Sequence, residues 1–302
     1  MTGASVRTDW TSSVARGAEP DDVALRDHLR AVHQEYAGFT ESCATNCRDE
    51  SGRTSYEWLA EAVDCDRHQV LLDIACGSGP LLQLCHETMP SDLRLIGIDM
   101  SPNELTLARE RLPEGRATLV EGEAQRLDCL PDNSVDIALC HWALTLMDPV
   151  ADVLMELARV IAPGGRFAAL VDGPMDAAPR YEAVHDLIYG YVQAEMPNYG
   201  AIELGDPRVR TGESLVTLIE RVLPGAMARI ETNVVRMSAP STTLAKEASG
   251  FFYAAFVLSA TAREQMLSDL AGLLDDMAAG QTPTFEMPVN RLIVEFPAYE
   301  PC

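Results

Sequence analysis

The feature that most constrains the fold is the alternation of short apolar runs with helical patterns in the middle of the chain. The apolar runs have the length of strands and lie at residues 70–74, 93–98, 118–120, 135–140 and 167–171. Helical segments separate most of them, and parallel strands need such crossover connections. The pattern therefore predicts an α/β fold with a doubly wound, mostly parallel sheet covered by helices.

Local signals indicate where the helices between these strands begin and end. Ser101 is placed as an N-cap, Pro102 as the first helical residue, and Glu104 completes a capping box. The Pro-Gly-Gly turn at residues 163–165 is expected to end another helix immediately before the strand at 167–171. Both boundaries support the βαβ interpretation.

The regions on either side of this alternation are predicted to be mainly helical. Residues 21–46 form one long helical pattern and residues 54–63 a shorter one, so residues 1–68 are expected to be an N-terminal helical cap. After Asp172 the alternation breaks. Four helices are expected at 181–195, 211–222, 242–258 and 262–279, and two last strands at 229–237 and 285–296.

With these last strands the expected sheet has seven strands, and residues 69–302 are predicted to form one domain. Helical insertions at about residues 176–225 and 240–282 flank the last two strands. We expect them to form a lid over the carboxyl edge of the sheet, where ligands of such folds bind.

The chain is strongly acidic. Asp and Glu number 46 against 23 Lys and Arg, which gives a formal net charge of -23. Such a field repels the phosphates of nucleic acids and of anionic lipids, so neither nucleic acid nor membrane is an expected partner. Small molecules, including cations, are the ligand class that remains.

The sequence shows no pattern of a membrane span, a disulfide framework or a metal site. The first 20 residues are polar, and no apolar run approaches the roughly 18 residues of a membrane span. The eight cysteines show no paired spacing, which favours a reduced, cytoplasmic setting. Cys43 and Cys47 would share a helix face, but no further ligands accompany them, so no metal site is expected.

The strongest chemical signal is a strand that leads into a turn of small residues at positions 70–80, V-L-L-D-I-A-C-G-S-G-P. Small residues let a ligand approach the backbone, and the helix that starts near Pro80 offers free N–H groups. A dinucleotide site would need a third glycine where Leu82 stands. A P-loop would need Gly-Lys-Ser/Thr, so neither phosphate-binding motif fits.

Acids also follow the next two strands. Asp99 ends the second strand, where a carboxylate can accept hydrogen bonds from ribose hydroxyls. The alternative is that Asp99 only caps the following helix, a role that Ser101 already fills. Glu123 follows the third strand and can accept from an adenine amino group, while the N–H of Ala124 serves a ring nitrogen. Such an acidic pocket suits a ligand with net positive charge.

Together these elements resemble the class I S-adenosylmethionine-dependent methyltransferases, which have a Rossmann-like fold. Within that family they resemble the small-molecule methyltransferases related to those of quinone biosynthesis. The resemblance covers residues 69–172 and departs from the family pattern at Ala75, which stands where a first glycine is usual. It rests on Asp73-x-Ala75-x-Gly77-x-Gly79, Asp99, Glu123-Ala124, Leu130-Pro131-Asp132-Asn133-Ser134 and Pro163-Gly164-Gly165.

The resemblance implies a site for S-adenosylmethionine as the cofactor, with S-adenosylhomocysteine as its product. In that family the turn holds the methionine part, which here assigns it to Asp73, Ala75, Cys76, Gly77, Ser78 and Gly79. Asp99 would bind the ribose hydroxyls, and Met100 would pack on the adenine. Glu123 and Ala124 would bind the adenine edge.

Three residues outside these motifs are candidates for the reacting end of the site. His141 follows the fourth strand and is expected either as a general base for the acceptor or as lining of the cofactor pocket. His185, in a later helix, is a second candidate base. Tyr36, in the N-terminal helix, is expected either to close over the sulfonium or to pack in the core.

The expected function is methyl transfer to oxygen, nitrogen or carbon of a small molecule. Lys246 is the one lysine in the chain, and this bias toward arginine, with the resemblance, favours bacterial specialised metabolism. Three alternatives remain open. The cofactor could serve as a structural element in a rearrangement or cyclisation, the protein could be an NAD-dependent oxidoreductase, or it could be a ligand sensor without catalysis. The missing third glycine argues against the oxidoreductase.

Overall fold

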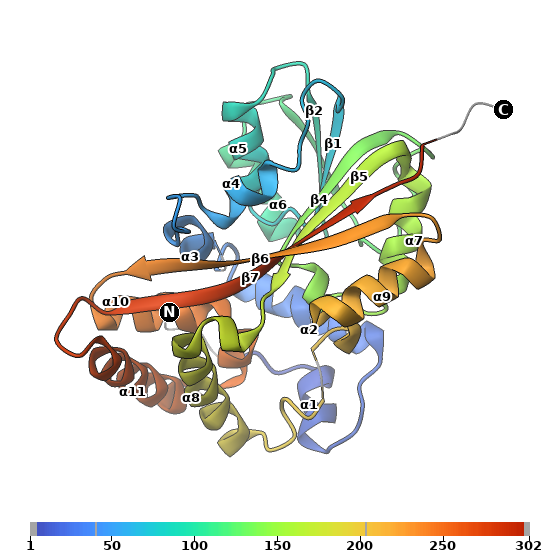
Figure 1. Ribbon diagram of the computed structural model, residues 1–302. Helices are drawn as coiled ribbons and strands as arrows, with labels where there is room; N and C mark the ends of the chain where they lie inside the picture. Colours follow the sequence, from blue (N-terminus) through green and yellow to red (C-terminus); the bar gives the residue numbers. More distant parts are fainter. Residues whose placement is uncertain (1–4, 40, 203, 299–302) are drawn as a thin grey trace. The chain divides into compact units, whose positions relative to one another are not determined.

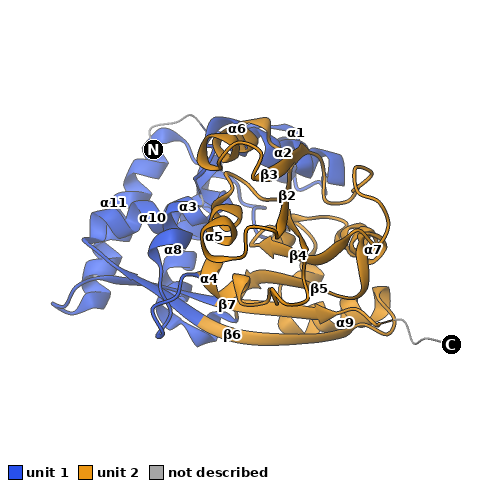
Figure 2. Cartoon of the chain, turned by 90° about the horizontal axis from the view of Figure 1, so that it is seen from above, with its two compact units in different colours: residues 1–54, 174–204, 234–288 blue, residues 55–173, 205–233, 289–302 orange. Residues whose placement is uncertain are grey.

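The computed structural model describes residues 5–39, 41–202 and 204–298. The chain divides into two compact units, each assembled from three segments (Figure 2). Unit 1 comprises residues 1–54, 174–204 and 234–288, and unit 2 comprises residues 55–173, 205–233 and 289–302. Unit 2 contains the small-residue turn, whereas unit 1 contains most of the N-terminal and late helices.

A seven-stranded sheet is the main element of the fold (Figure 1), which confirms the predicted class. Its order is β3-β2-β1-β4-β5-β7-β6; the first five strands are parallel neighbours, and β7 is antiparallel to β5. The strand order reverses between β1 and β4, the point at which ligands bind in such sheets. The strands are β1 (Val70–Ile74), β2 (Arg94–Asp99), β3 (Ala117–Glu121), β4 (Val135–His141), β5 (Ile161–Asp172), β6 (Met227–Ser238) and β7 (Thr284–Glu295).

The helices of unit 2 connect these strands and bury one apolar face each. In α7 the side chains of Val150, Val153, Leu154 and Leu157 recur at helical spacing, and all four are fully buried. The helices of this unit are α4 (Ser55–Ala60), α5 (Pro80–Thr88), α6 (Pro102–Arg111), α7 (Val150–Val160) and α9 (Gly212–Val222), with short 3-10 turns η1 (Leu144–Leu146) and η3 (Pro207–Val209).

The expected role of the Pro-Gly-Gly turn at residues 163–165 is wrong. Helix α7 ends at Val160, before the turn, and β5 already begins at Ile161. Gly164, with a φ of 78°, lies inside β5, and the pairing of β5 with β4 shifts register between Val135 and Ile137. The turn residues therefore make an irregularity in a strand, because a left-handed glycine permits a bulge as readily as it ends a helix.

Unit 1 is mainly helical and differs from the prediction at its N-terminal end. The single helix expected at 21–46 is two helices, because Tyr36 leaves the helical conformation and Gly38 has a φ of 73°. Helix α1 was not expected. The helices of this unit are α1 (Asp9–Ala15), α2 (Asp22–Glu35), α3 (Glu41–Asn46), α8 (Pro179–Glu195), α10 (Ser241–Phe251) and α11 (Ala260–Ala278), with 3-10 turns η2 (Met175–Ala177) and η4 (Tyr253–Val257). That residues 1–68 form a cap, and residues 176–225 and 240–282 a lid, stays a prediction.

A buried histidine connects the first two helices of unit 1. His28 is fully buried in α2, and its ring stacks on Trp10 of α1 with 4.8 Å between ring centroids. Its Nδ1 lies 3.0 Å from the hydroxyl oxygen of Thr8, and its Nε2 has no hydrogen-bond partner within the described part of the chain. Burial therefore lowers the pKa of His28 to about 4 from its ordinary value of 6.5.

This histidine is expected to make the protein less stable in mild acid. Because the pKa of His28 is depressed in the folded state, the unfolded state takes up a proton first as the pH falls below 6.5. The free energy of unfolding should therefore lose about 2 kcal/mol between about pH 7 and about pH 5 through this residue. Urea unfolding at several pH values measures this dependence. In His28→Gln the free energy of unfolding should lose about 2 kcal/mol less between about pH 7 and about pH 5, and an unchanged pH dependence would contradict the assignment.

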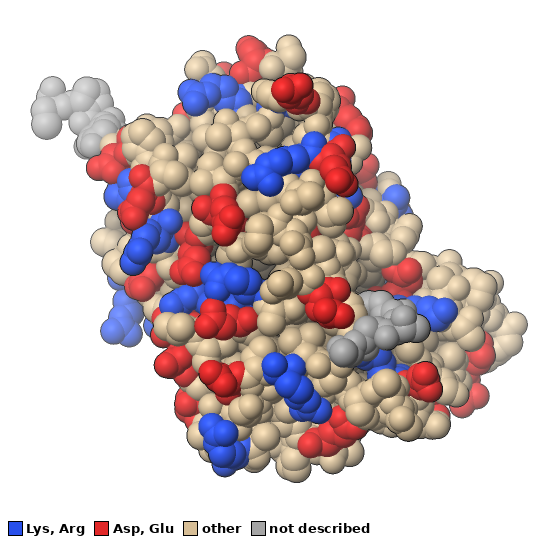
Figure 3. All heavy atoms as spheres, turned by 180° about the vertical axis from the view of Figure 1, so that it is seen from behind, with Lys and Arg blue, Asp and Glu red and all other residues tan. Residues whose placement is uncertain are grey.

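The surface of the described residues carries both signs of charge, despite the acidic total. Acidic and basic side chains are interspersed over the face in Figure 3. Every helix in the described part of the chain is too short or too polar to cross a membrane. The same residues contain no group of three or more side chains suited to hold a metal ion.

Candidate functional site

The predicted site residues of unit 2 lie at the carboxyl ends of adjacent parallel strands. Asp73 and the small-residue turn belong to β1 and its end, and Asp99 ends β2 next to β1. The N–H of Gly122, just after β3, donates to the carbonyl of Asp99 at 3.0 Å. The sheet thus brings together three loops that are separated in the sequence.

The turn itself is a series of left-handed residues that ends in a helix. Ala75, Gly77 and Gly79 have φ values of 53°, 53° and 80°. Gly79 is the N-cap of α5 and makes no side-chain cap, so the first N–H groups of α5 are not capped by a side chain. A Cβ on Gly79 would lie only 3.1 Å from the Cβ of Ala108 in α6. Glycine is needed here for both the conformation and the close packing.

Ala75 adopts a left-handed conformation, with a φ of 53°, that favours glycine. An L-residue other than glycine pays about 1 kcal/mol or more in the left-handed region. Ala75→Gly is therefore expected to raise the free energy of unfolding by about 0.5–1 kcal/mol, measured by urea unfolding. Ala279→Gly, at another left-handed alanine with a φ of 49°, should give a similar gain. Ala138→Gly, inside buried β4, should instead cost about 1 kcal/mol or more, and a gain there would undermine the argument.

Asp99 holds the turn and the next helix together. One carboxylate oxygen accepts from the N–H of Gly77 at 2.8 Å, and the other accepts from the N–H of Ser101 at 2.8 Å. Only 8% of Asp99 is exposed. The hydroxyl of Ser101, the N-cap of α6, accepts from the N–H of Glu104, as predicted. The backbone N–H of Ser101 donates to Asp99, and not to the side chain of Glu104 as a capping box would require. Asp99 therefore has a structural role in addition to the ligand role expected for it.

Asp73 is a buried acid with an unused oxygen. It is 1% exposed, and its Oδ2 has no hydrogen-bond partner among the described residues. Burial, and then the nearby carboxylate of Asp99, raise the pKa of Asp73 well above its ordinary value. A cation that reached Asp73 would relieve both effects. This is the electrostatic signature expected of a functional site.

Glu104 belongs to the same acidic cluster but was not predicted as a site residue. It is 2% exposed in the first turn of α6, and its Oε2 lies 3.8 Å from the position of a Cβ on Gly77. The sequence pattern explained Glu104 as part of a capping box and so offered no reason to place it at the turn. We name Asp73, Asp99 and Glu104 the acidic cluster.

The remaining predicted cofactor residues lie in the turn or just after β2 and β3, and they differ in burial. The N–H of Cys76 donates to the carbonyl of Ile98 at 3.0 Å, and burial raises the pKa of its thiol well above the ordinary value. Ser78 is 3% and Ala124 is 8% exposed, whereas Met100 and Glu123 are partly exposed. These residues lie on the turn or follow β2 and β3, and their contacts with a ligand stay a prediction.

His141 lies at the end of β4 in an unexpected environment. Its Nε2 is 2.9 Å from the hydroxyl oxygen of Ser55, and its ring stacks on Tyr56 with 3.8 Å between centroids and 18° between planes. Both partners come from α4. Burial lowers the pKa of His141 to about 3, so the ring is neutral at pH 7 and has little affinity for a proton. This argues against the general-base role and is compatible with pocket lining.

Tyr36 and His185 belong to unit 1. The hydroxyl of Tyr36 accepts from Arg263 at 3.2 Å, and its ring packs against Phe256 with 4.7 Å between centroids. The ring of His185 stacks on Tyr189 in α8. Tyr36 thus has a packing role within its own unit, and the sulfonium contact proposed for it stays a prediction, as does the base role of His185.

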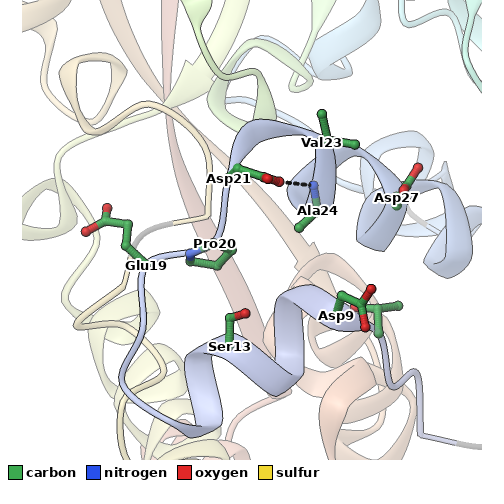
Figure 4. A pocket seen from close by; sticks show the side chains of 9 residues that line it. Asp9, Ser13, Glu19, Pro20, Asp21, Val23, Ala24 and Asp27 are labelled. Atoms are coloured by element: carbon green, nitrogen blue, oxygen red, sulfur yellow. Dashed lines mark hydrogen bonds between the residues drawn. The ribbon is translucent and has the colours of Figure 1, made fainter.

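Unit 1 also has a pocket of about 690 Å³ that no sequence motif indicated (Figure 4). Four acidic residues line it, and two of them have local structural roles. Asp21 accepts from the N–H of Ala24 as the N-cap of α2, and Asp27 pairs with Arg30 at 2.8 Å. The lining residues are Thr8, Asp9, Ser13, Glu19, Pro20, Asp21, Val23, Ala24 and Asp27.

Comparisons with known proteins find matches over the part of the chain that contains the turn and Asp99. Residues 72–169 match the family model described as a methyltransferase domain. A demethylmenaquinone methyltransferase of Symbiobacterium thermophilum is 36% identical over 104 residues, which are 33% of this chain and 41% of that protein. The same-named protein of Listeria welshimeri is 29% identical over 48% of this chain and 61% of that protein. The chain thus spans about half the length of these curated relatives.

Solved structures share the fold at low sequence identity. The [4+2]-cyclase SpnF has a TM-score of 0.57 at 17% identity, over 93% of this chain and 98% of that one. Phosphoethanolamine N-methyltransferase 2 of Haemonchus contortus, solved with S-adenosyl-L-methionine, has a TM-score of 0.55 at 16% identity, over 90% of this chain and 60% of that one. At such identities the likeness establishes the fold alone.

Proposed function

We propose, on the premise that residues 72–169 carry a methyltransferase domain, that the protein transfers the methyl group of S-adenosylmethionine to a small molecule. The observation that carries the proposal is the acidic cluster against the small-residue turn. S-adenosylmethionine has an ammonium and a sulfonium against one carboxylate, so its net charge is positive. Three buried carboxyl groups suit such a ligand.

The residues present fit this cofactor. The unused Oδ2 of buried Asp73 offers an acceptor for the ammonium, directly or through water, and Gly77 leaves the backbone accessible beside it. Asp99, which ends β2 beside the turn, would accept from the ribose hydroxyls, since a carboxylate can accept several hydrogen bonds at once. Met100, Glu123 and Ala124 would contact the adenine. When bound, the cofactor supplies an electrophilic methyl group.

The chain's own contribution is then binding, alignment and exclusion of water. Methyl transfer is an in-line displacement that needs little covalent chemistry from the protein, and proximity can supply up to roughly 7–11 kcal/mol of the barrier. His141 is neutral and stacked on Tyr56, so we assign it to the lining of the site and not to proton removal.

The acceptor is proposed to be a small organic molecule. The curated relatives are named for the methylation of demethylmenaquinone, so a quinone precursor is the first acceptor to test. Compounds of bacterial specialised metabolism, which the composition favoured, are the second set.

Calorimetry and product analysis on the full chain test this proposal. We expect S-adenosylmethionine and S-adenosylhomocysteine to bind and NAD to displace neither. With an accepted substrate, S-adenosylhomocysteine should accumulate in equal amount to the methylated product. Product without S-adenosylhomocysteine would favour a rearrangement or cyclisation, and displacement by NAD would favour an oxidoreductase. Absence of binding would overturn the proposal.

A further inference from the structure

The side chain of His141 is supported by a helix that precedes the methyltransferase domain in sequence. Ser55 is the first residue of α4 and is fully buried, and its hydroxyl is hydrogen-bonded to Nε2 of His141 at 2.9 Å. The ring of the next residue, Tyr56, covers one face of the imidazole. Two consecutive residues of α4 therefore restrict both the position and the rotation of His141.

Helix α4 is itself held in place within unit 2. The guanidinium of Arg291, in β7, lies over the ring of Trp58 at 4.7 Å and also hydrogen-bonds to the carbonyl of Trp58. The residue after His141, Trp142, has a φ of 58° and packs edge-on against the imidazole, with 5.0 Å between ring centroids. A bulky residue in that conformation is strained, and such strain clusters at functional sites.

The burial of Ser55 decides the direction of its hydrogen bond. If Nε2 carried the proton and donated to Ser55, the hydroxyl hydrogen of Ser55 would be buried without an acceptor, because Nε2 is its one partner among the described residues. Leaving a buried donor unsatisfied costs about 1–3 kcal/mol. The favoured arrangement has the Ser55 hydroxyl donating to Nε2, so the ring proton is on Nδ1.

We propose that Ser55 is a positioning residue that holds His141 in the Nδ1–H tautomer, so that His141 donates a hydrogen bond to an oxygen of the bound methyl acceptor. His141 is partly exposed, and no hydrogen bond to its Nδ1 is found among the described residues, so this N–H is available to a ligand. The fitting ligand group is an oxygen with negative or partial negative charge, such as a phenolate or a carbonyl. The tautomer stands independently of the proposed function, whereas the donor role rests on it.

Nitrogen-15 NMR of the histidine-labelled full chain tests the tautomer without substrate or cofactor. The His141 signals are identified by their loss in His141→Asn. We expect a protonated Nδ1 and an unprotonated Nε2 that stay unchanged between about pH 5 and about pH 8, because burial keeps the ring neutral. In Ser55→Ala the proton should redistribute toward Nε2, and Ser55→Thr, which keeps the hydroxyl, should restore it. A proton on Nε2 in the wild type, or no change in Ser55→Ala, would overturn the proposal.

A matched pair of variants tests the donor role. The amide of Asn can place an N–H near the position of Nδ1, whereas the longer Gln side chain reaches toward the position of Nε2. A donor role therefore predicts that His141→Asn turns over faster than His141→Gln, with the difference mainly in KM for the acceptor. Neither amide is a base, so a general-base role predicts the same loss in both variants. If turnover at saturation instead fell equally in both variants, by about 10²-fold or more, His141 would be a general base and the donor role would be overturned. If no acceptor is methylated by the wild type, the proposed function fails, while the NMR experiment still decides the tautomer.

Discussion

Asp73→Asn is expected to make the free protein more stable while it removes most of its affinity for S-adenosylmethionine. The carboxyl of Asp73 is 1% exposed, and its Oδ2 has no hydrogen-bond partner among the residues that the structure describes. Neutral Asn avoids the cost of a buried charge, so the free energy of unfolding at pH 7 should rise by about 1–3 kcal/mol. The lost charge should weaken cofactor binding at least about tenfold, since a hydrogen bond to a charged group contributes about 1.5–3 kcal/mol.

The stability gain should depend on pH with a definite sign. Because the pKa of Asp73 is raised in the folded state, the folded protein keeps the proton above the ordinary value of 3.8, and stability is lost as the pH rises from there through the raised pKa. The advantage of Asp73→Asn should therefore be present at pH 7 and vanish below about pH 4. Urea unfolding across this pH range measures the stability, and calorimetry measures the affinity.

The same substitution at the opposite end of the strand pair is the control. Asp136 of β4 accepts from the N–H groups of Gln69 and Val70 at 2.8 and 2.9 Å, near the start of β1. Asp136→Asn should lower stability and leave cofactor affinity unchanged. If Asp73→Asn lowered stability as Asp136→Asn does, or kept full affinity, the cationic site at Asp73 would be refuted.

Asp99→Ala is expected to lower both stability and cofactor affinity. Its carboxylate satisfies the N–H groups of Gly77 and Ser101, and each buried N–H left without a partner costs about 1–3 kcal/mol. Loss of the bonds to the ribose hydroxyls should add at least about a tenfold loss of affinity. Thermal unfolding and calorimetry on the same preparations measure the two effects.

Asp136→Ala separates these two effects, because it also removes a carboxylate that accepts from two backbone N–H groups. A comparable loss of stability with unchanged cofactor affinity is expected for it. An affinity loss of the same size in both variants would mean that Asp99 acts on binding through the fold alone. Retained affinity in Asp99→Ala would exclude the ribose contact.

Many of the strands and helices were predictable because their signals are local. The run at Val70–Ile74 was predicted with the bounds that the structure has, and the strand pattern at 229–237 became β6 (Met227–Ser238). The prediction failed at glycines, because the same residue is compatible with more than one local structure. Gly38 separates α2 from α3, and Gly164 lies in β5 instead of ending α7, because a glycine with positive φ suits a helix end, a bend or a bulge equally well.

The residues of the candidate site also fall into those that the sequence predicted and those that it did not. The turn at residues 73–79 and the acid Asp99 were predicted, because residue size and strand position are properties of neighbouring residues. Ser55 and Tyr56 were missed, since the hydrogen bond from Ser55 to His141 spans 86 positions and nothing near Ser55 indicates it. Glu104 was assigned to a capping box, and its place beside Gly77 follows only from the packing of α6 against the turn.

The amino-acid sequence by itself determined the parallel sheet, the small-residue turn and the chemical character of the acids at the strand ends, because apolar period and residue size act over a few positions. The tertiary structure alone decided which of those groups are buried and which are satisfied. Within the described residues, the fold buries Asp73 with no hydrogen-bond partner for its Oδ2 and gives Asp99 two backbone N–H donors. It also places Ser55, Tyr56 and Trp142 against the ring of His141. These differences arise because desolvation and hydrogen bonding depend on residues that only folding brings together, and desolvation shifts the pKa of Asp73 upward and that of His141 downward.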